Sequence, residues 1–379
     1  MRNVPKLRFK EFSGEWEEKK LKNIVEINPR TEELPNEFIY IDLESVENGI
    51  LKEKKIIQKE NAPSRAKRNV KLNDILYQTV RPYQQNNLFF YFDDEFEYIA
   101  STGYAQLRSI KNNPKYIYQL LHTKKFLDKV LENCTGTSYP AINSNDLGNI
   151  NILYTLNIKE QQKIADFLSN IDKKISITEE KLDLFKKYKK GIMQKIFNQE
   201  LRFKDSEGND YPEWEEKKLD DIMKVSSSTI SQNTLEDNQG KYIIYGATGE
   251  IKKIDFYDKE KEYIGIVKDG AGVGRCFYCE EKSSVLATLN YLDIKENNNL
   301  KFCYYILNKI DFTKYIVGSS IPHIYFKDYK FEKIQLPCLE EQQKIADFLS
   351  SIDNKIDNLT SELENLKEFK KGLLQQMFV

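Results

Sequence analysis

The clearest pattern in the chain is a stripe of apolar positions that recurs in two separate stretches, at steps alternating between four and three residues. Such steps average 3.5 residues, the repeat of a left-handed coiled coil, and here they continue over about five heptads. The pattern predicts two long helices, each with one face that needs a partner helix. The first stripe is Ile164, Leu168, Ile171, Ile175, Thr178, Leu182, Phe185, Lys189, Ile192 and Ile196, and the second is Ile345, Leu349, Ile352, Ile356, Leu359, Leu363, Leu366, Lys370, Leu373 and Met377.

The two predicted helices are copies of one another. The segment EQQKIADFLS at 160–169 returns at 341–350, and KKGIMQKIF at 189–197 aligns with KKGLLQQMF at 370–378 in the same register. A continuous helix requires this ungapped alignment, because one inserted residue would rotate all later side chains by about 100°. Asn157 and Glu160 have the spacing of a capping box, and Pro337 stands just before the second helix. The simplest partner for each helix is the other one, in antiparallel orientation.

A second repeat precedes each variable block. LRFK and EWEEKKL, which begin at Leu7 and Glu15, recur from Leu201 and Glu213. The blocks that follow, about 22–159 and 220–340, share little beyond GTSYPAI at 136–142 and GSSIPHI at 318–324. Strand-like runs such as DILYQTV alternate with helical stretches such as 113–133, so we expect two diverged versions of one fold.

These patterns predict a mixed α/β (α+β) protein with two globular domains, separated by two long antiparallel coiled-coil helices and related by a pseudo-twofold repeat. The predicted segments are a first domain at 1–156, a first helix at 157–198, a second domain at 199–337 and a second helix at 338–379.

Several polar helix positions are also identical in the two copies. Helix pairing alone would allow different residues at these outward-facing positions. We interpret them as two equivalent surfaces that dock two copies of one partner, with recent duplication as the alternative. The predicted docking residues are Gln161, Gln162 and Asp166 in the first helix and Gln342, Gln343 and Asp347 in the second.

Composition and charge narrow the class of protein. The 379 residues are 40% hydrophobic and 31% charged, with a net charge of −1. No apolar run approaches the roughly 18 residues that span a bilayer, and the N-terminal stretch has no signal-peptide core, so we expect a cytoplasmic protein without a membrane segment. Affinity for nucleic acid would have to come from local clusters, such as residues 52–71 with eight Lys or Arg and two Glu.

Catalytic and metal-binding patterns are weak. Cys276 and Cys279 have C-x-x-C spacing, but the flanking sequence is strand-like and no second pair accompanies it, so reduced, buried thiols are the preferred interpretation over a metal site. The base-binding loop of an amino-methyltransferase requires two adjacent prolines, and this sequence has none. The sequence also lacks the phosphate-binding motif G-x-x-x-x-G-K-[ST]. His122 and His323 have no nucleophile or ligand pattern around them. We predict a chain without catalytic residues, metal or cofactor of its own.

The alternation of EWEEKKL leads, dissimilar blocks and EQQKIADFLS helices resembles the specificity subunit of type I restriction-modification systems, over nearly the whole chain. The stretches 64–82 and 267–292 are similar to parts of that family's target recognition domains. The resemblance implies that each block reads one half of a split double-stranded DNA target and that the helices set the gap and bind two methyltransferase subunits. It also implies partners that methylate adenine with S-adenosylmethionine or, with restriction subunits added, use ATP and Mg to cleave DNA.

Candidate DNA contacts follow from side-chain chemistry, since Arg and Lys neutralise phosphates and Arg, aromatic and amide groups read bases. We expect Arg65, Lys67 and Arg68 to lie in a polar loop before a strand. The remaining candidates are Arg81, Tyr83, Ser138, Tyr139, Lys268, Arg275, Ser319, Ser320 and His323.

A different class stays open: an adaptor that does not bind DNA, with two ligand-binding domains on a coiled-coil rod. The near-neutral charge favours it, whereas the basic cluster favours DNA. Salt-sensitive retention on heparin or random duplex DNA would distinguish the two.

Overall fold

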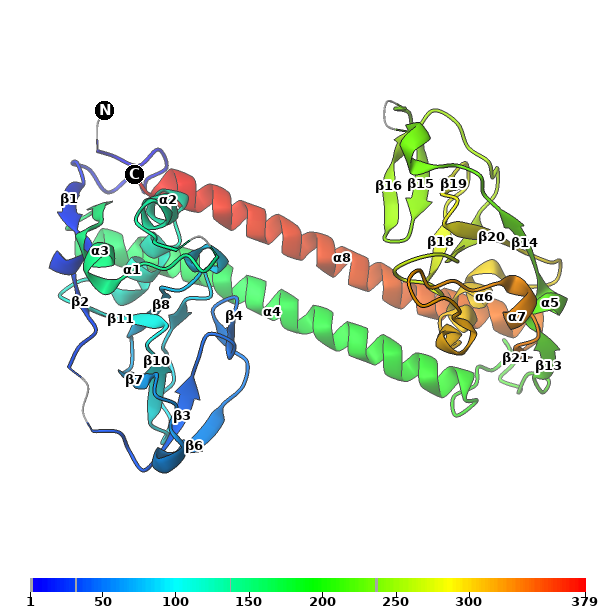
Figure 1. Ribbon diagram of the computed structural model, residues 1–379, viewed down its shortest axis with the longest axis horizontal. Helices are drawn as coiled ribbons and strands as arrows, with labels where there is room; N and C mark the ends of the chain where they lie inside the picture. The colour runs from blue at the N-terminus through cyan, green and yellow to red at the C-terminus, as the bar shows by residue number, and fades with distance from the viewer. Residues whose placement is uncertain (1–2, 31–32, 137, 236–237) are drawn as a thin grey trace. The chain divides into compact units, whose positions relative to one another are not determined.

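The computed structural model describes residues 3–30, 33–136, 138–235 and 238–379 (Figure 1). Its contacts form two compact units: unit 1 contains Met1–Glu180 and Thr360–Val379, and unit 2 contains Lys181–Leu359. Each unit therefore combines one variable block with a part of both long helices. The segment boundaries at 156, 198 and 337 remain predictions.

Unit 1 is built on two four-stranded sheets. One has the order β2-β11-β8-β9 with antiparallel neighbours, and the other has the order β6-β3-β10-β7, in which β3 and β10 are parallel. Two further pairs are β1-β12 and β4-β5. The strands are β1 (Glu17–Lys20), β2 (Val25–Ile27), β3 (Glu37–Ile41), β4 (Val46–Glu47), β5 (Ile50–Leu51), β6 (Lys55–Gln58), β7 (Ala66–Asn69), β8 (Ile75–Gln78), β9 (Leu88–Phe89), β10 (Tyr98–Ser101), β11 (Tyr104–Ser109) and β12 (Asn151–Tyr154).

Short helices complete the block of unit 1. The stretch 113–133 forms two helices instead of one continuous helix, because the Thr123 side chain accepts a hydrogen bond from the Phe126 N–H and starts a new helix. The helices are α1 (Pro114–Leu121), α2 (Lys124–Glu132), α3 (Ser144–Asn149) and the 3-10 turns η1 (Leu21–Asn23), η2 (Lys59–Asn61) and η3 (Pro82–Gln84).

Unit 2 has the corresponding sheets in the orders β14-β20-β17-β18, β16-β15-β19 and β13-β21. Its strands are β13 (Glu215–Lys218), β14 (Met223–Ser227), β15 (Tyr242–Gly246), β16 (Gly249–Ile254), β17 (Tyr263–Val267), β18 (Cys276–Cys279), β19 (Ser284–Val285), β20 (Leu289–Ile294) and β21 (Lys333–Leu336). Its helices are α5 (Leu219–Ile222), α6 (Leu300–Leu307), α7 (Phe326–Tyr329), η4 (Gln232–Leu235) and η5 (Phe312–Tyr315).

The two blocks share one topology. The order β2-β11-β8-β9 of unit 1 matches β14-β20-β17-β18 of unit 2, and in both units the EWEEKKL lead pairs with the strand just before the long helix. The predicted mixed fold with two diverged copies is confirmed.

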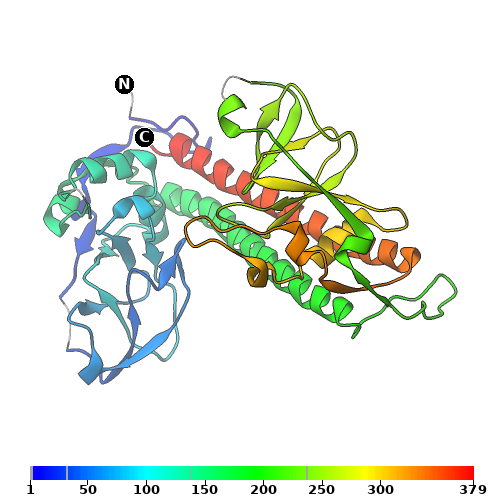
Figure 2. The same cartoon turned by 45° about the vertical axis from the view of Figure 1, so that its right-hand side comes forward.

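The long helices are α4 (Ile158–Phe197) and α8 (Leu339–Met377), which lie side by side in both units (Figures 1 and 2). All twenty positions of the two predicted stripes are buried or half-buried. In unit 1, Lys370 pairs with Asp172 at 2.5 Å and Lys174 pairs with Glu362 at 3.0 Å. Early residues of α4 thus meet late residues of α8, and the antiparallel prediction is confirmed.

The one lysine in each stripe forms a polar node with the neighbouring block. Asp172 pairs with Lys370 and also accepts a hydrogen bond from Gln119 Nε2 on α1, at 2.6 Å. In unit 2, Asp353 pairs with Lys189 and accepts from Tyr305 on α6. Each node fixes one block helix against both long helices.

A buried ion pair explains why the LRFK lead and the EQQ helix start are repeated together. Arg8 Nε and Nη2 donate to the two carboxylate oxygens of Glu160, at 2.7 and 2.9 Å, and the Glu160 side chain is fully buried. Arg202 makes the same contact with the buried Glu341. Asn157 caps α4 through the Lys159 and Glu160 N–H groups, but Glu160 turns to Arg8, so only half of the expected capping box forms.

Candidate nucleic-acid interface

Two loops that are far apart in the sequence meet at one edge of unit 1. Loop 79–86 follows β8, and loop 135–142 carries the GTSYPAI segment, of which Thr137 lies outside the described residues. The Arg81 N–H donates to the Pro140 carbonyl at 2.7 Å, and the Ile142 N–H donates to the Thr79 carbonyl at 3.0 Å. The structure thus brings together two of the segments chosen from sequence.

Arg81 and Tyr139 form the centre of this junction. The Arg81 guanidinium lies over the Tyr139 ring, 4.4 Å from its centroid, and 65% of Tyr139 is exposed. Among the described residues, the Arg81 side chain makes no hydrogen bond or ion pair. Its backbone has a φ of 53°, a left-handed conformation that costs a non-glycine residue about 1 kcal/mol or more.

The junction borders a groove of about 970 Å³ in unit 1. Its lining includes Arg65, Arg81, Gln84, Asn86 and Tyr139, together with Lys52, Glu44 and Glu47. Lys52 pairs with Glu47 at 3.4 Å, so the basic groups of the groove that form no ion pair with another described residue are Arg65 and Arg81. Arginine, amide and aromatic groups are the side chains that contact phosphates and base edges. Tyr83 and Ser138 are exposed nearby but do not line it.

A buried polar network supports loop 79–86 from below. Gln78 is 1% exposed and donates to Val80 O and Gln84 Oε1, both at 2.8 Å, while it accepts from the Asn86 N–H. Asn87, equally buried, accepts from the Gln78 N–H and contacts His122 Nε2 at 3.2 Å. Gln78 and Asn87 are not among the site residues predicted from sequence, although they directly flank loop 79–86.

His122 has a structural role at the end of α1. Its Nδ1 lies 2.8 Å from the Tyr118 carbonyl, so this nitrogen carries the proton and Nε2 accepts from Asn87. Burial, together with the nearby charge of Lys370, lowers the pKa of His122 to about 4, which keeps the ring neutral at physiological pH.

Unit 2 repeats the junction with different side chains. The Gly270 N–H donates to the Pro322 carbonyl at 2.8 Å, and the Ile324 N–H donates to the Lys268 carbonyl at 3.0 Å. Gly136 and Gly318 have φ values of 89° and 92°, which explains the glycine that the GTSYP and GSSIP loops share. By these bonds Gly270 occupies the position of Arg81, and His323 occupies that of Ala141.

The candidate residues of unit 2 gather around its junction. Lys268 forms an ion pair with Asp269 at 3.6 Å, and His323 Nδ1 lies 3.9 Å from the same carboxylate. Arg275 is exposed and donates to the Ala247 carbonyl at 3.0 Å. Ser319 and Ser320 are exposed on the GSSIP loop. Positive, hydroxyl and imidazole groups and the Asp269 carboxylate thus surround a glycine turn, and the described residues of unit 2 contain no counterpart of the Arg81–Tyr139 pair.

The basic cluster at 52–71 differs from expectation. Lys67 and Arg68 lie within β7 instead of a loop, and only Arg65 precedes the strand. Burial lowers the pKa of Arg68, and its buried Nε has no hydrogen-bond partner in the part of the chain that the structure describes. Lys54 pairs with Asp94 at 2.6 Å. The surface charge of the cluster is therefore smaller than its composition suggests.

Two predicted docking residues are wrong. Gln161 and Gln342 are 0% and 1% exposed, and each accepts a hydrogen bond from the N–H of the asparagine that caps a block helix, Asn113 or Asn299. Their repetition follows from packing inside each unit, because the buried amide needs these partners.

The other four docking candidates, Gln162, Asp166, Gln343 and Asp347, are exposed. Gln162 Nε2 donates to Asp166 Oδ1 at 2.7 Å, and Gln343 makes the same bond to Asp347 at 2.8 Å. These four remain candidates for a docking surface.

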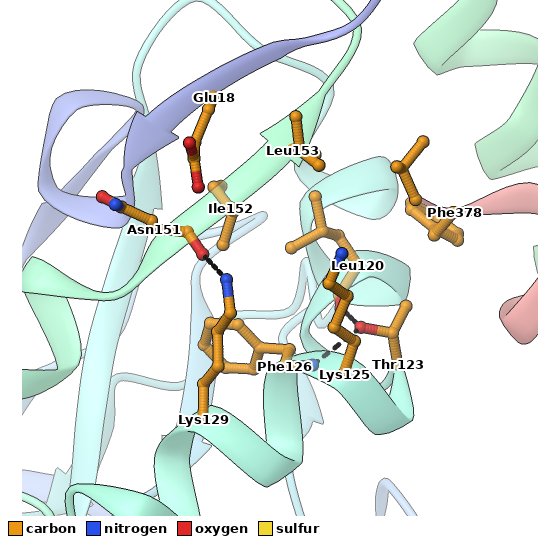
Figure 3. Close-up of a pocket in the computed structure, with 11 residues that line it drawn as sticks. Glu18, Leu120, Thr123, Lys125, Phe126, Lys129, Asn151, Ile152, Leu153 and Phe378 are labelled. Atoms are coloured by element: carbon orange, nitrogen blue, oxygen red, sulfur yellow. Dashed lines mark hydrogen bonds between the residues drawn. The ribbon is translucent and has the colours of Figure 1, made fainter. Parts of the chain in front are cut away.

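A small pocket and a pair of cysteines lie outside the two junctions. One pocket of unit 1 has a volume of about 50 Å³, room for a few water molecules only. Figure 3 shows Phe378 near Leu120 and Thr123 in its lining. Cys276 and Cys279 are buried on β18, and burial raises the pKa of both thiols to about 12. Among the described residues, no helix combines the length and apolar character needed to cross a bilayer.

The fold and the two junctions define a class of protein: a duplicated protein, in which the loops of both units have the same backbone hydrogen bonds but carry different side chains.

Comparison with known proteins identifies the family. Residues 13–186 and 211–368 match the type I restriction modification DNA specificity domain, so the chain belongs to this family. It is 27% identical over 288 residues to the type I restriction enzyme MjaVIII specificity subunit of Methanocaldococcus jannaschii, covering 67% of this chain and 68% of that protein. The chain is thus a DNA specificity subunit, the non-catalytic component of a type I system.

Solved structures have the same fold. The S subunit of a type I restriction-modification system from M. genitalium superimposes with a TM-score of 0.70 at 18% identity, covering 99% of both chains. A chain from a structure describing complex assembly and conformational transition of the type I R-M system gives 0.55 at 19% identity, covering 96% of this chain and 97% of that one.

Proposed function

We propose that unit 1 and unit 2 each read one half of a bipartite, asymmetric target in double-stranded DNA, through the loop junctions at Arg81–Tyr139 and Lys268–His323. The observation that carries this proposal is the contrast between the two junctions. Their backbone hydrogen bonds match pair for pair, yet the side chains that they present differ. Two different half-sites require the same backbone arrangement in both units but different side chains to contact the bases.

The long helices set the gap between the half-sites. The polar nodes support this role, because a change in helix register would separate Asp172 from Lys370 and remove the ion pair between them. Inserting residues in α4 should therefore change the gap in the target and leave the bases of each half unchanged.

Two methyltransferase subunits dock on equivalent faces of the helices. Besides Gln162 and Gln343, two exposed aromatic rings support this, Tyr188 on α4 and Phe369 on α8, which are 50% and 55% exposed at equivalent repeat positions. Large aromatic side chains dominate the binding energy of protein interfaces. Each ring lies three residues before a glycine, Gly191 or Gly372, at which an added Cβ would meet nothing within 4 Å.

The chemistry belongs to the partners. The methyltransferase subunits supply S-adenosylmethionine-dependent methylation of adenine, and restriction subunits supply ATP- and Mg-dependent cleavage. This chain contributes the choice of sequence.

The test is co-expression of the chain with its methyltransferase subunit, followed by genome-wide mapping of methylated adenine. We expect one two-part asymmetric motif. Exchanging residues 22–159 for the block of another specificity subunit should change one half only. A motif in one continuous piece, or a change in both halves after the exchange, would contradict the proposal.

A further inference from the structure

We infer that Arg81 reads a guanine in the major groove and is a specificity-determining residue of the half-site bound by unit 1. The inference rests on the proposed function, because it assumes that the junction of unit 1 contacts base edges. It adds the base that is read and the residue that reads it.

The first argument is the backbone of Arg81. The equivalent position in unit 2 is Gly270, and both residues have a left-handed backbone, with φ values of 53° and 86°. Glycine adopts this conformation at no steric cost, whereas arginine is strained there. An arginine at a position where the same fold accepts glycine points to a role for its side chain, because the backbone alone would be more stable with glycine.

The second argument is the way in which the side chain is held. The Tyr139 ring lies under the guanidinium, with the cation 4.4 Å from the ring centroid. A cation held by a ring face keeps its N–H donors free, because the attraction is to the charge and uses no hydrogen bond. The Arg81 guanidinium is therefore held in one orientation with its N–H donors free. A bidentate pair of hydrogen bonds from arginine to guanine O6 and N7 is the commonest specific contact in the major groove.

The third argument is the rigidity of the loop. The buried Gln78 side chain makes three hydrogen bonds, to Val80 O, Gln84 Oε1 and the Asn86 N–H, which enclose the segment that carries Arg81. Base reading needs donors held in register, whereas a phosphate contact tolerates a mobile side chain. Arg65 is exposed in the same groove, and no aromatic ring of the described residues lies against its guanidinium, so it is the residue suited to a phosphate.

The experiment compares the wild-type complex with complexes that carry Arg81→Gly, Arg81→Lys or Arg65→Ala, each with the methyltransferase subunits, by selection from a randomised duplex DNA library. Arg81→Gly installs the residue that unit 2 has and removes the backbone strain, so the variant should unfold at or above the wild-type temperature. Arg81→Lys keeps the charge but loses the bidentate fork.

Both Arg81 variants should retain the unit 2 half-site and lose discrimination at one guanine of the other half, by about 10-fold to 100-fold. Arg65→Ala should weaken binding to all sequences equally. A uniform loss of affinity with Arg81→Gly, or a unit 1 half-site without a guanine, would overturn the inference while the two-part motif stands. Absence of any two-part motif with the wild-type complex would refute the proposed function itself.

Discussion

Removing Arg8 should destabilise unit 1 strongly, because the Glu160 carboxylate would remain buried with one donor. In the structure three donors reach this carboxylate: Arg8 Nε at 2.7 Å, Arg8 Nη2 at 2.9 Å and Thr155 Oγ1 at 2.7 Å. Arg8→Met deletes two of them and keeps most of the aliphatic volume. Breaking a buried pair on one side costs about 3 to 5 kcal/mol. The expected destabilisation at pH 7 is therefore about 4 kcal/mol, the middle of this range.

The assay is urea unfolding followed by the fluorescence of Trp16, which is buried in unit 1. The chain has two tryptophans, so a Trp214→Phe background makes the signal specific to unit 1. With a urea dependence of about 1 to 3 kcal/mol per M, the midpoint should fall by more than about 1 M. The double variant Arg8→Met with Glu160→Met should recover most of the loss, since an apolar pair of similar volume is often neutral.

The matched control is Lys163→Met, which breaks the neighbouring ion pair with Glu11. Both of those side chains are 48% exposed, and an exposed pair contributes about 0 to 1 kcal/mol. If Arg8→Met costs no more than Lys163→Met, burial does not decide the strength of this contact, and the reasoning fails.

Two further predictions concern acid stability and docking. His122 must stay neutral in the fold with its pKa near 4, while the unfolded chain protonates near 6.5, so stability should fall between pH 6.5 and 4 by at most about 3 kcal/mol. His122→Asn, which installs the residue that caps α6 at Asn308, should flatten this slope in the same urea assay; an unchanged slope would refute the assignment. Tyr188→Ala or Phe369→Ala should each remove one of two methyltransferase subunits in native mass spectrometry, weakening that site by about 30-fold or more. Leu184→Ala is the control, because this residue is 57% exposed but is not repeated in α8; equal loss with it would argue against the docking faces.

Many residues of the candidate site could be predicted from sequence, because they lie in short polar segments that contain arginine, lysine, histidine or aromatic side chains. The sequence predicts Arg81, Tyr139, Lys268 and His323 as candidate contacts from their side-chain chemistry, and in the structure they lie at two equivalent junctions. Their pairing was not accessible, since the Arg81–Tyr139 contact joins residues 58 positions apart in sequence. The docking surface was predicted less well, because identity between repeats does not distinguish a buried amide such as Gln161 from an exposed one such as Gln162.

The sequence by itself determined the two long helices, the duplication and the division into two unlike blocks. Helix formation and heptad spacing are local, periodic properties, so they can be read along one dimension. Only the tertiary structure decided which partner each polar group has: Glu160 with Arg8 across 152 positions, and Asp172 with Lys370 across 198. A periodic stripe shows that one face of a helix must be covered, but the group that reaches a buried charge depends on the path of the whole chain.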